Sequence, residues 1–371
     1  MSQKMNIITK LRQPFVLDRL GSKEEFERGP LVVEWDTTEV CNLACPGCIS
    51  EDLVASSNSF TTERLLGIAQ ELVNIGTKAV VLIGGGEPLA HPAAGELIRF
   101  LGEHDIRVGI TTNGYFIPRY MDEIAKYSSW TRVSMDAATS EMFVKLRPGK
   151  DGKSKFDYIV QAMRDLAKVK KGNLGFSYLI RTEADGFGLP SNIHEIYDAA
   201  LLARDIGCDY FEVKPSYAYT GGQDHALVKH SPERMAEAKH EVARLEGLDT
   251  DTFKVIRAIT LEASLNCVDV PQEKDYHFCP AAHLRTLICP SGVFVCPYWR
   301  GKERFRIGDA QTESIADIWH GERRAGIMKE LDPIKKCQFH CLRNETNQEI
   351  IRLMGMKRED IEEVAEYDRF I

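Results

Sequence analysis

The sequence lacks the features that mark membrane and secreted proteins. It contains no run of ~18 consecutive apolar residues, so we expect no membrane-spanning helix. Residues 1–10 do not follow the positively charged and then apolar pattern of a signal peptide. Internal repeats and low-complexity segments are also absent from the 371 residues. These absences predict a cytoplasmic globular protein without a membrane partner.

A surplus of positive charge is also missing. Lys and Arg together number 47 against 55 Asp and Glu, which gives a formal net charge of −8. A protein whose main task is to bind nucleic acid normally carries a basic surface. We therefore expect no nucleic-acid partner. The length indicates a large domain with a smaller one, and an apolar content of 43% is sufficient for a packed core.

Cysteine, in contrast, is abundant and unevenly spread. Ten cysteines without a secretion signal indicate metal or redox chemistry rather than disulfides. Three of them lie within residues 41–48 and five within residues 279–341, whereas Cys208 and Cys267 stand alone. This distribution predicts two metal-binding groups that are far apart in the sequence.

From residue 30 onward, apolar β-branched runs alternate with amphipathic runs of helical period. This alternation is typical of strand–helix units with parallel strands, whose functional loops follow the carboxyl ends of the strands. Six units are too few to close an eight-unit barrel of ~250 residues. The expected strands cover residues 31–35, 79–83, 108–112, 132–135, 174–180 and 210–214.

The loop after the first expected strand carries the first cysteine group. Cys41, Cys45 and Cys48 are spaced as C-x3-C-x2-C. Thiolates are the usual ligands of iron–sulfur clusters, and three of them would leave one iron of a four-iron cube open. Part of a zinc site and buried, inert cysteines remain as alternatives on spacing alone.

The run of residues 41–48 resembles the signature of the radical S-adenosylmethionine (SAM) enzymes. The resemblance implies an α/β fold with a partial (β/α)6 barrel and a [4Fe–4S] cluster whose open iron binds SAM. An electron from the cluster would cleave SAM to a 5′-deoxyadenosyl radical, which abstracts a hydrogen atom from the substrate. It also implies an electron donor such as flavodoxin or ferredoxin as a partner.

The same resemblance assigns SAM-binding residues to the ends of later strands. Gly85, Gly86 and Glu87 resemble the "GGE" motif that holds the SAM amino group, although three glycines also make an ordinary tight turn. Asn113 lies in a "TNG" element of the family.

Four further SAM contacts are expected at the ends of the fourth to sixth strands. Ser134 and Asp136 form an "S-x-D" element that can bond ribose hydroxyls, or alternatively a helix cap or turn. Arg181 is placed to pair with the SAM carboxylate, unless it is an ordinary surface Arg. Val213 takes the position where the family packs adenine against the backbone.

The second cysteine group resembles the SPASM/twitch extension of radical SAM enzymes. A hairpin turn is expected at Gly292, and an "IG-D" stretch follows at residues 307–309. The full SPASM version needs seven cysteines, and only five are present here, which implies the twitch version with one auxiliary [4Fe–4S] cluster. Cys289 is the expected spare, and a structural zinc site is the alternative. The expected auxiliary ligands are Cys279, Cys296, Cys337 and Cys341.

These assignments divide the chain into five parts. They are an N-terminal arm (1–29), the radical SAM partial barrel (30–217), a bridging helical region (218–275), the SPASM/twitch-like auxiliary cluster domain (276–345) and a C-terminal helical tail (346–371).

The substrate is not identified by any motif. Only about 29 residues precede the first strand, too few for a winged-helix peptide-recognition domain, which favours a small molecule such as a sugar or aminocyclitol. The expected reaction is dehydrogenation aided by the auxiliary cluster, or epimerisation with Cys208 or Cys289 as thiol donor. A maturase that modifies a ribosomally made peptide is the alternative.

Three residues near the strand ends are candidate catalytic groups, namely Tyr178, Glu212 and Lys214. Glu212 and Lys214 share one face of the sixth strand because strand side chains alternate. A salt bridge with no catalytic duty explains this pair equally well.

Overall fold

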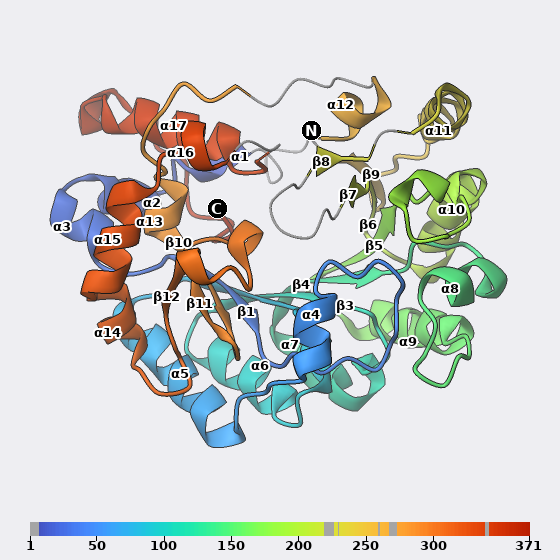
Figure 1. The fold of residues 1–371 in the computed structure, drawn as a ribbon, viewed down its shortest axis with the longest axis horizontal. Helices are drawn as coiled ribbons and strands as arrows, with labels where there is room; N and C mark the ends of the chain where they lie inside the picture. The colour runs from blue at the N-terminus through green and yellow to red at the C-terminus, as the bar shows by residue number, and fades with distance from the viewer. Residues whose placement is uncertain (1–6, 219–225, 229, 259, 267–272, 338–340) are drawn as a thin grey trace.

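The computed structural model has a ten-stranded sheet at its centre (Figure 1). The strands follow the order β12-β11-β10-β1-β2-β3-β4-β5-β6-β9, and β7 and β8 form a separate pair. The structure describes residues 7–218, 226–228, 230–258, 260–266, 273–337 and 341–371.

The strands of the sheet are β1 (Val32–Asp36), β2 (Ala79–Ile83), β3 (Arg107–Thr112), β4 (Ser128–Ser134), β5 (Asn173–Leu179), β6 (Tyr210–Lys214), β9 (Lys254–Arg257), β10 (Arg285–Cys289), β11 (Gly292–Phe294) and β12 (Arg306–Gly308). The separate pair is β7 (Tyr217–Ala218) and β8 (Ala226–Leu227). The helices are α1 (Ile7–Lys10), α2 (Pro14–Leu20), α3 (Lys23–Glu27), α4 (Glu51–Ser56), α5 (Thr62–Ile75), α6 (Ala94–Glu103), α7 (Met121–Tyr127), α8 (Ser140–Leu146), α9 (Phe156–Val169), α10 (Ile196–Ile206), α11 (Pro232–Arg244), α12 (Leu261–Leu265), α13 (Ala281–Leu284), α14 (Ile315–His320), α15 (Glu322–Glu330), α16 (Pro333–Lys336) and α17 (Asn344–Met354).

The six predicted strands are present as β1 to β6, and they pair in parallel in sequence order. Parallel neighbours need crossover connections, which the amphipathic helices supply. Helix α5 shows how the sequence sets such a helix: the Thr61 hydroxyl caps it by accepting from the Arg64 N–H, and Gly76 ends it at φ 86°. The predicted α/β partial barrel is confirmed.

Side chains of the first strands alternate between two cores. Val33 and Trp35 of β1 pack with the helices on the outer side of the sheet, where α6, α7, α9 and α10 contact β3 to β6. Val32 and Val81 belong to a second core on the inner side, with residues of α2 and with Ile371. The period of two along each strand therefore separates an outer, helix-covered face from an inner face.

Four strands that the sequence did not predict in this sheet extend it, with β10, β11 and β12 beyond β1 and with β9 beyond β6. Strand β10 of the second cysteine region pairs in parallel with β1, with Val32 opposite Arg285. Strand β9 pairs in parallel with β6, with Tyr210 opposite Lys254. The predicted bridging helical region, residues 218–275, therefore contains this strand as well as α11 and α12, and a four-residue strand with charged ends shows no clear alternation.

The expected helical tail is only partly helical. Helix α17 ends at Met354, and the last residues fold back as irregular chain onto the N-terminal helices. The Gln13 side chain accepts a hydrogen bond from the backbone N–H of Tyr367 at 2.7 Å. Phe370 packs against Trp130 with ring centroids 5.4 Å apart, so the end of the chain lies near the middle of the molecule (Figure 1). Burial of these apolar groups outweighs the helical tendency of the charged residues before them.

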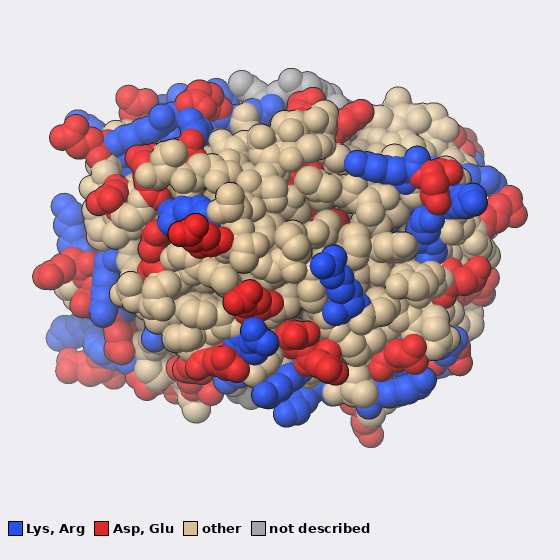
Figure 2. Space-filling view, turned by 90° about the horizontal axis from the view of Figure 1, so that it is seen from below, with Lys and Arg blue, Asp and Glu red and all other residues tan. Residues whose placement is uncertain are grey.

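The surface has mixed charge on the face seen from below. Figure 2 shows Lys and Arg side chains interspersed with Asp and Glu around a broad area in which uncharged residues predominate. Within the described residues, none of the helices combines the length and apolar character needed to span a bilayer.

Candidate functional site

The first cysteine loop leaves β1 and ends at α4. Gly47 in this loop has φ +66°, and a Cβ atom there would lie 2.4 Å from Phe187 and 2.7 Å from Nη2 of Arg181. Only glycine tolerates both the backbone conformation and this close approach. The loop is therefore pressed against the segment that follows β5.

A second segment holds the loop from the other side. The backbone N–H of Ala44 donates to the Pro148 carbonyl at 2.9 Å, and the N–H of Lys150 donates to the Asn42 carbonyl at 3.2 Å. Leu43 and Gly149 form an isolated antiparallel bridge. These bonds order a loop that has no regular structure of its own.

The three thiols of this loop lie close enough to influence one another electrostatically. Burial raises the pKa of Cys45 to about 11, and the neighbouring thiols of Cys41 and Cys48 raise it further, whereas Arg147 lowers it. Neutral thiols are poor metal ligands, so a bound cation must displace their protons. Three convergent thiols beside one guanidinium fit a cluster with three thiolate ligands.

Arg147 is the main residue that the sequence reasoning missed. Its Nε and Nη2 atoms lie 2.8 and 2.6 Å from Oδ2 of Asp136, and both side chains are largely buried. The charge of Asp136 keeps the pKa of Arg147 above its usual value although burial acts in the opposite direction. The only sequence signal was the Pro148-Gly149 turn after it, which says nothing of its partner.

The predicted Gly-rich motif lies directly against the chain that enters the cysteine loop. A Cβ atom on Gly86 would be 2.4 Å from the Val40 carbonyl oxygen and 2.5 Å from the Glu39 carbonyl carbon. The Glu87 N–H donates to the same Val40 carbonyl at 2.9 Å. Glycine at this position allows the two backbones to touch.

Glu87 joins this loop to the predicted "TNG" element. Its carboxylate accepts hydrogen bonds from the Thr112 hydroxyl at 2.5 Å, the Asn113 N–H at 2.7 Å and the Leu89 N–H at 3.1 Å. The Asn113 amide in turn donates to Oδ1 of Asn42 at 2.8 Å. The structure therefore brings the two predicted elements together beside the cysteine loop.

The buried Glu87 makes stability depend on pH. Burial raises its pKa to about 7 from 4.5, although its hydrogen bonds act in the opposite direction. Between pH 4.5 and about 7, the Glu87 carboxyl is still protonated in the folded protein but already ionised in the unfolded chain. Stability should therefore fall as the pH rises from about 4.5 to about 7, by up to about 3 kcal/mol.

Urea unfolding of the cofactor-free protein across this pH range measures the effect. The Glu87→Gln variant is the control, because its amide does not titrate and the fall should be smaller by that amount. An equal slope in both proteins would contradict the prediction.

The remaining predicted SAM contacts differ in how accessible they are. Asp136 has φ +56°, and its carboxylate is engaged by Arg147 and by the Leu179 N–H at 2.7 Å. Arg181 pairs with Asp185 at 2.6 Å, and its buried Nη2 has no hydrogen-bond partner. Ser134 is half-buried opposite Ser177.

Val213 is fully buried, and its carbonyl accepts from the Ala258 N–H at 3.1 Å. The predicted adenine contact at Val213 therefore has its carbonyl already hydrogen-bonded to the residue that follows β9.

Tyr178 is wrong as a catalytic candidate. Its side chain is 0% exposed, and its hydroxyl donates to the Asn192 carbonyl at 2.6 Å. It packs against Phe211 in the core on the helix-covered side of the sheet. The alternation along β5 places it on the face opposite Ser177.

The thiol donors expected for epimerisation are also buried. Cys208 lies in the outer core and comes just before β6, at the end of the sheet opposite the functional loops. Cys289 is fully buried and donates to the Gly292 carbonyl at 3.1 Å. Cys208 is therefore wrong as a donor, and Cys289 has no access to a substrate.

The second cysteine group converges in space. Burial raises the pKa of Cys279 to about 11 and that of Cys337 to about 12, and in both cases the thiol of Cys341 raises it further. Burial also raises the pKa of Cys296 well above its usual value, and Cys341 and Cys279 add to this rise. The charged neighbours of Cys289 are instead Asp36, Arg300 and Glu39.

Hydrogen-bond donors reach at least two of these four thiols. The Asn347 amide donates to the Cys279 sulfur at 3.5 Å, and the Arg343 N–H donates to the Cys341 sulfur at 3.3 Å. Hydrogen bonds to sulfur are a usual feature of iron–sulfur sites. The donor set therefore fits a four-thiolate cluster.

Buried ion pairs connect the two cysteine groups. Asp36 at the end of β1 lies 2.8 Å from Arg300, and its Oδ2 would be 3.0 Å from a Cβ atom on Gly85. Glu34 accepts from Arg285 at 2.8 Å and from Arg343 at 3.2 Å. The second cysteine region therefore reaches the predicted Gly-rich SAM loop through charged side chains of β1.

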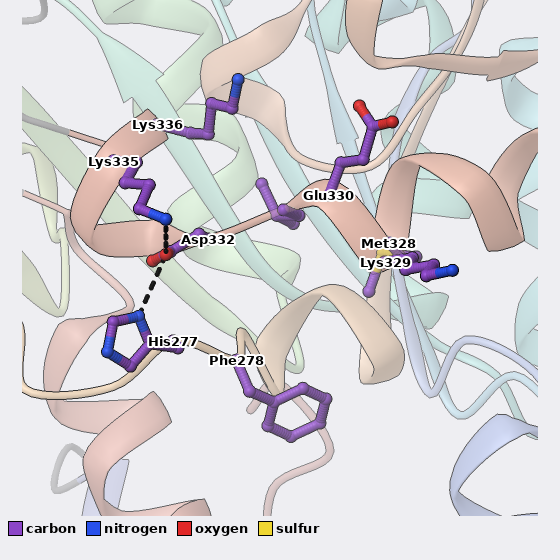
Figure 3. A pocket seen from close by; sticks show the side chains of 9 residues that line it. His277, Phe278, Met328, Lys329, Glu330, Asp332, Lys335 and Lys336 are labelled. Atoms are coloured by element: carbon purple, nitrogen blue, oxygen red, sulfur yellow. Dashed lines mark hydrogen bonds and ion pairs between the residues drawn. The ribbon is translucent and has the colours of Figure 1, made fainter.

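A surface pocket lies beside the second cysteine group (Figure 3). His277 and Lys335 point toward Asp332 at its edge, with distances of 3.0 and 3.4 Å. None of its lining residues is a cysteine, so it is separate from the thiol site.

The fold and the three-thiol loop define the protein class. Residues 35–186 match the model of the Radical SAM superfamily. The protein therefore contains a radical SAM domain, which confirms the predicted family and its cofactors, a [4Fe–4S] cluster and SAM.

Sequence relatives include several maturases. Mycofactocin maturase MftC of Mycobacterium tuberculosis is 32% identical over 192 residues, which cover 50% of this chain and 45% of MftC. MftC of Mycobacterium ulcerans is 27% identical over 83% of this chain and 79% of its own length. The chain thus spans about half the length of the first curated relatives it matches.

Solved structures share the fold. Streptococcus suis SuiB bound to its precursor peptide SuiA matches with a TM-score of 0.60 at 17% identity, over 85% of this chain and 72% of SuiB. AnSMEcpe with bound AdoMet matches with a TM-score of 0.57 at 15% identity, over 81% and 83% of the two chains. At these identities the likeness concerns the fold alone.

Proposed function

We propose that the protein is a radical SAM maturase that modifies a peptide. The observation that carries this proposal is the likeness to the MftC maturases, combined with the intact three-thiol loop. It replaces the small-molecule substrate that the sequence analysis favoured. The short segment before β1 was weak evidence, because a peptide can also be bound by the barrel itself or by a separate protein.

The cofactors would be held by residues from both ends of the chain. Cys41, Cys45 and Cys48 would hold the SAM-binding cluster, with the backbone of Gly85 and Gly86 beside it. The auxiliary cluster would be held by the four convergent thiols, which are Cys279, Cys296, Cys337 and Cys341. When bound, these groups supply a 5′-deoxyadenosyl radical that takes a hydrogen atom from the substrate, together with a nearby electron acceptor.

The protein's own charges prepare the first site. Arg147 places a positive charge beside three thiols that must be deprotonated, and Asp136 fixes the direction of its guanidinium. Arg181 points a buried, unpartnered N–H group toward the same loop, which suits a carboxylate of SAM. Arg147 would therefore stabilise the thiolates of the cluster, and Arg181 would bind the carboxylate of SAM.

We further propose an oxidative modification, with flavodoxin or ferredoxin as electron donor. Epimerisation requires a thiol close to the substrate, and the described thiols outside the two groups are buried. The candidate base Glu212 is poorly suited to take a proton, because Arg132 and Lys214 bring its pKa below the usual value although burial raises it.

Reconstitution under strict exclusion of oxygen tests the proposal. The protein should bind about eight irons and should release 5′-deoxyadenosine from SAM when reduced. A precursor peptide encoded beside the protein should then lose two mass units as hydrogen. Release of 5′-deoxyadenosine with a sugar or nucleotide substrate, and none with peptide, would favour the small-molecule alternative.

That alternative has its own support. Human molybdenum cofactor biosynthesis protein 1 is 23% identical over 82% of this chain and 46% of its own length. A non-peptide substrate therefore remains the second candidate function.

A further inference from the structure

A group of charged side chains lies on the inner wall of the barrel, on β4 and β6. Arg132 donates to Glu212 at 2.9 Å and to the Thr111 hydroxyl at 3.2 Å. Lys214 lies 3.6 Å from the same Glu212 oxygen. Two cations of this wall therefore share a single carboxylate.

These side chains face space that solvent can enter. The exposed fractions of the Arg132, Glu212 and Lys214 side chains are 24%, 16% and 28%. Below them the inner face is filled, because Trp130 packs against Phe370 and the Tyr210 ring occupies the place of a side chain on Gly175. The three charged side chains therefore lie next to packed aromatic rings on one side and are partly exposed to solvent on the other.

Arg132 and Lys214 share the single carboxylate of Glu212, whereas the other buried arginines near the first thiol loop each have a carboxylate of their own. Arg147 pairs with Asp136, Arg181 with Asp185, and each guanidinium has its own carboxylate. Arg300 and Asp36 form a third one-to-one pair.

Glu34 also receives two arginines, but these lie beside the second thiol group. The Arg343 N–H donates to the Cys341 sulfur at 3.3 Å, so thiolates of that group would balance the extra charge there. The other carboxylates that act on the pair on β4 and β6 are Glu34 and Asp136, and both are already held by arginines of their own. A half-buried cation without a counter-charge is costly, and a carboxylate of a ligand would remove that cost.

We propose that Arg132 and Lys214 bind a carboxylate of the substrate, so that the substrate is an acidic peptide with Asp or Glu near the modified residue. This inference rests on the proposed maturase function. Arg132 lies two residues before the end of β4, below the loops that carry the predicted SAM contacts. The carboxylate is therefore assigned to the substrate and not to SAM. Arg offers a planar fork and Lys a mobile point charge, a combination that suits one carboxylate.

Affinity selection with a random heptapeptide library, C-terminally amidated, tests this inference. The immobilised, cluster-loaded protein with SAM is exposed to the library, and bound peptides are sequenced by mass spectrometry. Peptides with Asp or Glu should be enriched about tenfold over their amide counterparts, as expected for one charge-assisted contact. Lys214→Met should lower this preference at least threefold, and Lys214→Arg should retain it.

Lys168→Met is the matched control, because Lys168 is an exposed lysine that pairs only with its helix neighbour Asp165. Iron content equal to wild type shows that each variant is folded. Peptides enriched without any acidic preference would overturn this inference while leaving the maturase proposal intact. Equal loss of preference in Lys168→Met would overturn it as well, and failure to bind any peptide would overturn the maturase proposal and this inference together.

Discussion

Replacing Cys41, Cys45 and Cys48 with alanine is expected to abolish the release of 5′-deoxyadenosine from SAM. The three thiols converge beside Arg147 and are the proposed ligands of the cluster that binds SAM. The variant should retain the auxiliary cluster, so it should bind about four irons per chain where the wild type binds about eight. Iron and sulfide analysis, together with chromatography of the SAM products, measures both effects.

Cys208→Ala is the matched control for this experiment. It also removes a thiol, but from the outer core at the opposite end of the sheet. It should keep full iron content and SAM cleavage, with only the modest loss of stability that follows from a smaller core side chain. SAM cleavage at the wild-type rate by the triple variant would refute the proposed cluster site.

Breaking the buried ion pair between Asp36 and Arg300 is expected to destabilise the fold by about 3–5 kcal/mol. Each single replacement, Asp36→Leu or Arg300→Met, leaves the other charge buried without its partner. The pair joins β1 to the second cysteine region, and a Cβ atom on Gly85 would lie 3.0 Å from Oδ2 of Asp36, so the loss should reach both sites. Urea unfolding of the cofactor-free protein measures the free energy.

The double replacement tests the reason for this loss. With both charges removed, much of the stability should return, because no uncompensated charge is left. Lys145→Met provides the control for an exposed pair: Lys145 and Glu141 are 47% and 81% exposed, and the cost should stay below about 0.5 kcal/mol. Equal costs for the buried and exposed pairs would contradict the argument.

Local patterns were sufficient for the parts of the structure that depend on neighbours in sequence. The Thr61 cap, the Gly76 stop and the six parallel strands follow from turn residues and from periodicity. The cysteine spacing likewise indicated the class of protein. These features need no knowledge of distant contacts.

The features that the sequence did not reveal all depend on long-range pairing. Arg147, which directly follows α8, reaches the cysteine loop only through tertiary packing, and β10 pairs with β1 only after more than 200 intervening residues. Tyr178 failed as a candidate for a related reason: the side of the sheet that it faces follows from the register of β5 and not from its composition.

The position of β10 beside β1 has a consequence for biosynthesis. Val32 is among the first strand residues to leave the ribosome, yet its outer partner Arg285 follows only after nearly all of the barrel. Until then β1 presents an open hydrogen-bonding edge, and Glu34 and Asp36 lack their arginines. The open edge of β1 therefore persists until β10 has been synthesised, and chaperone dependence should be greatest in that interval.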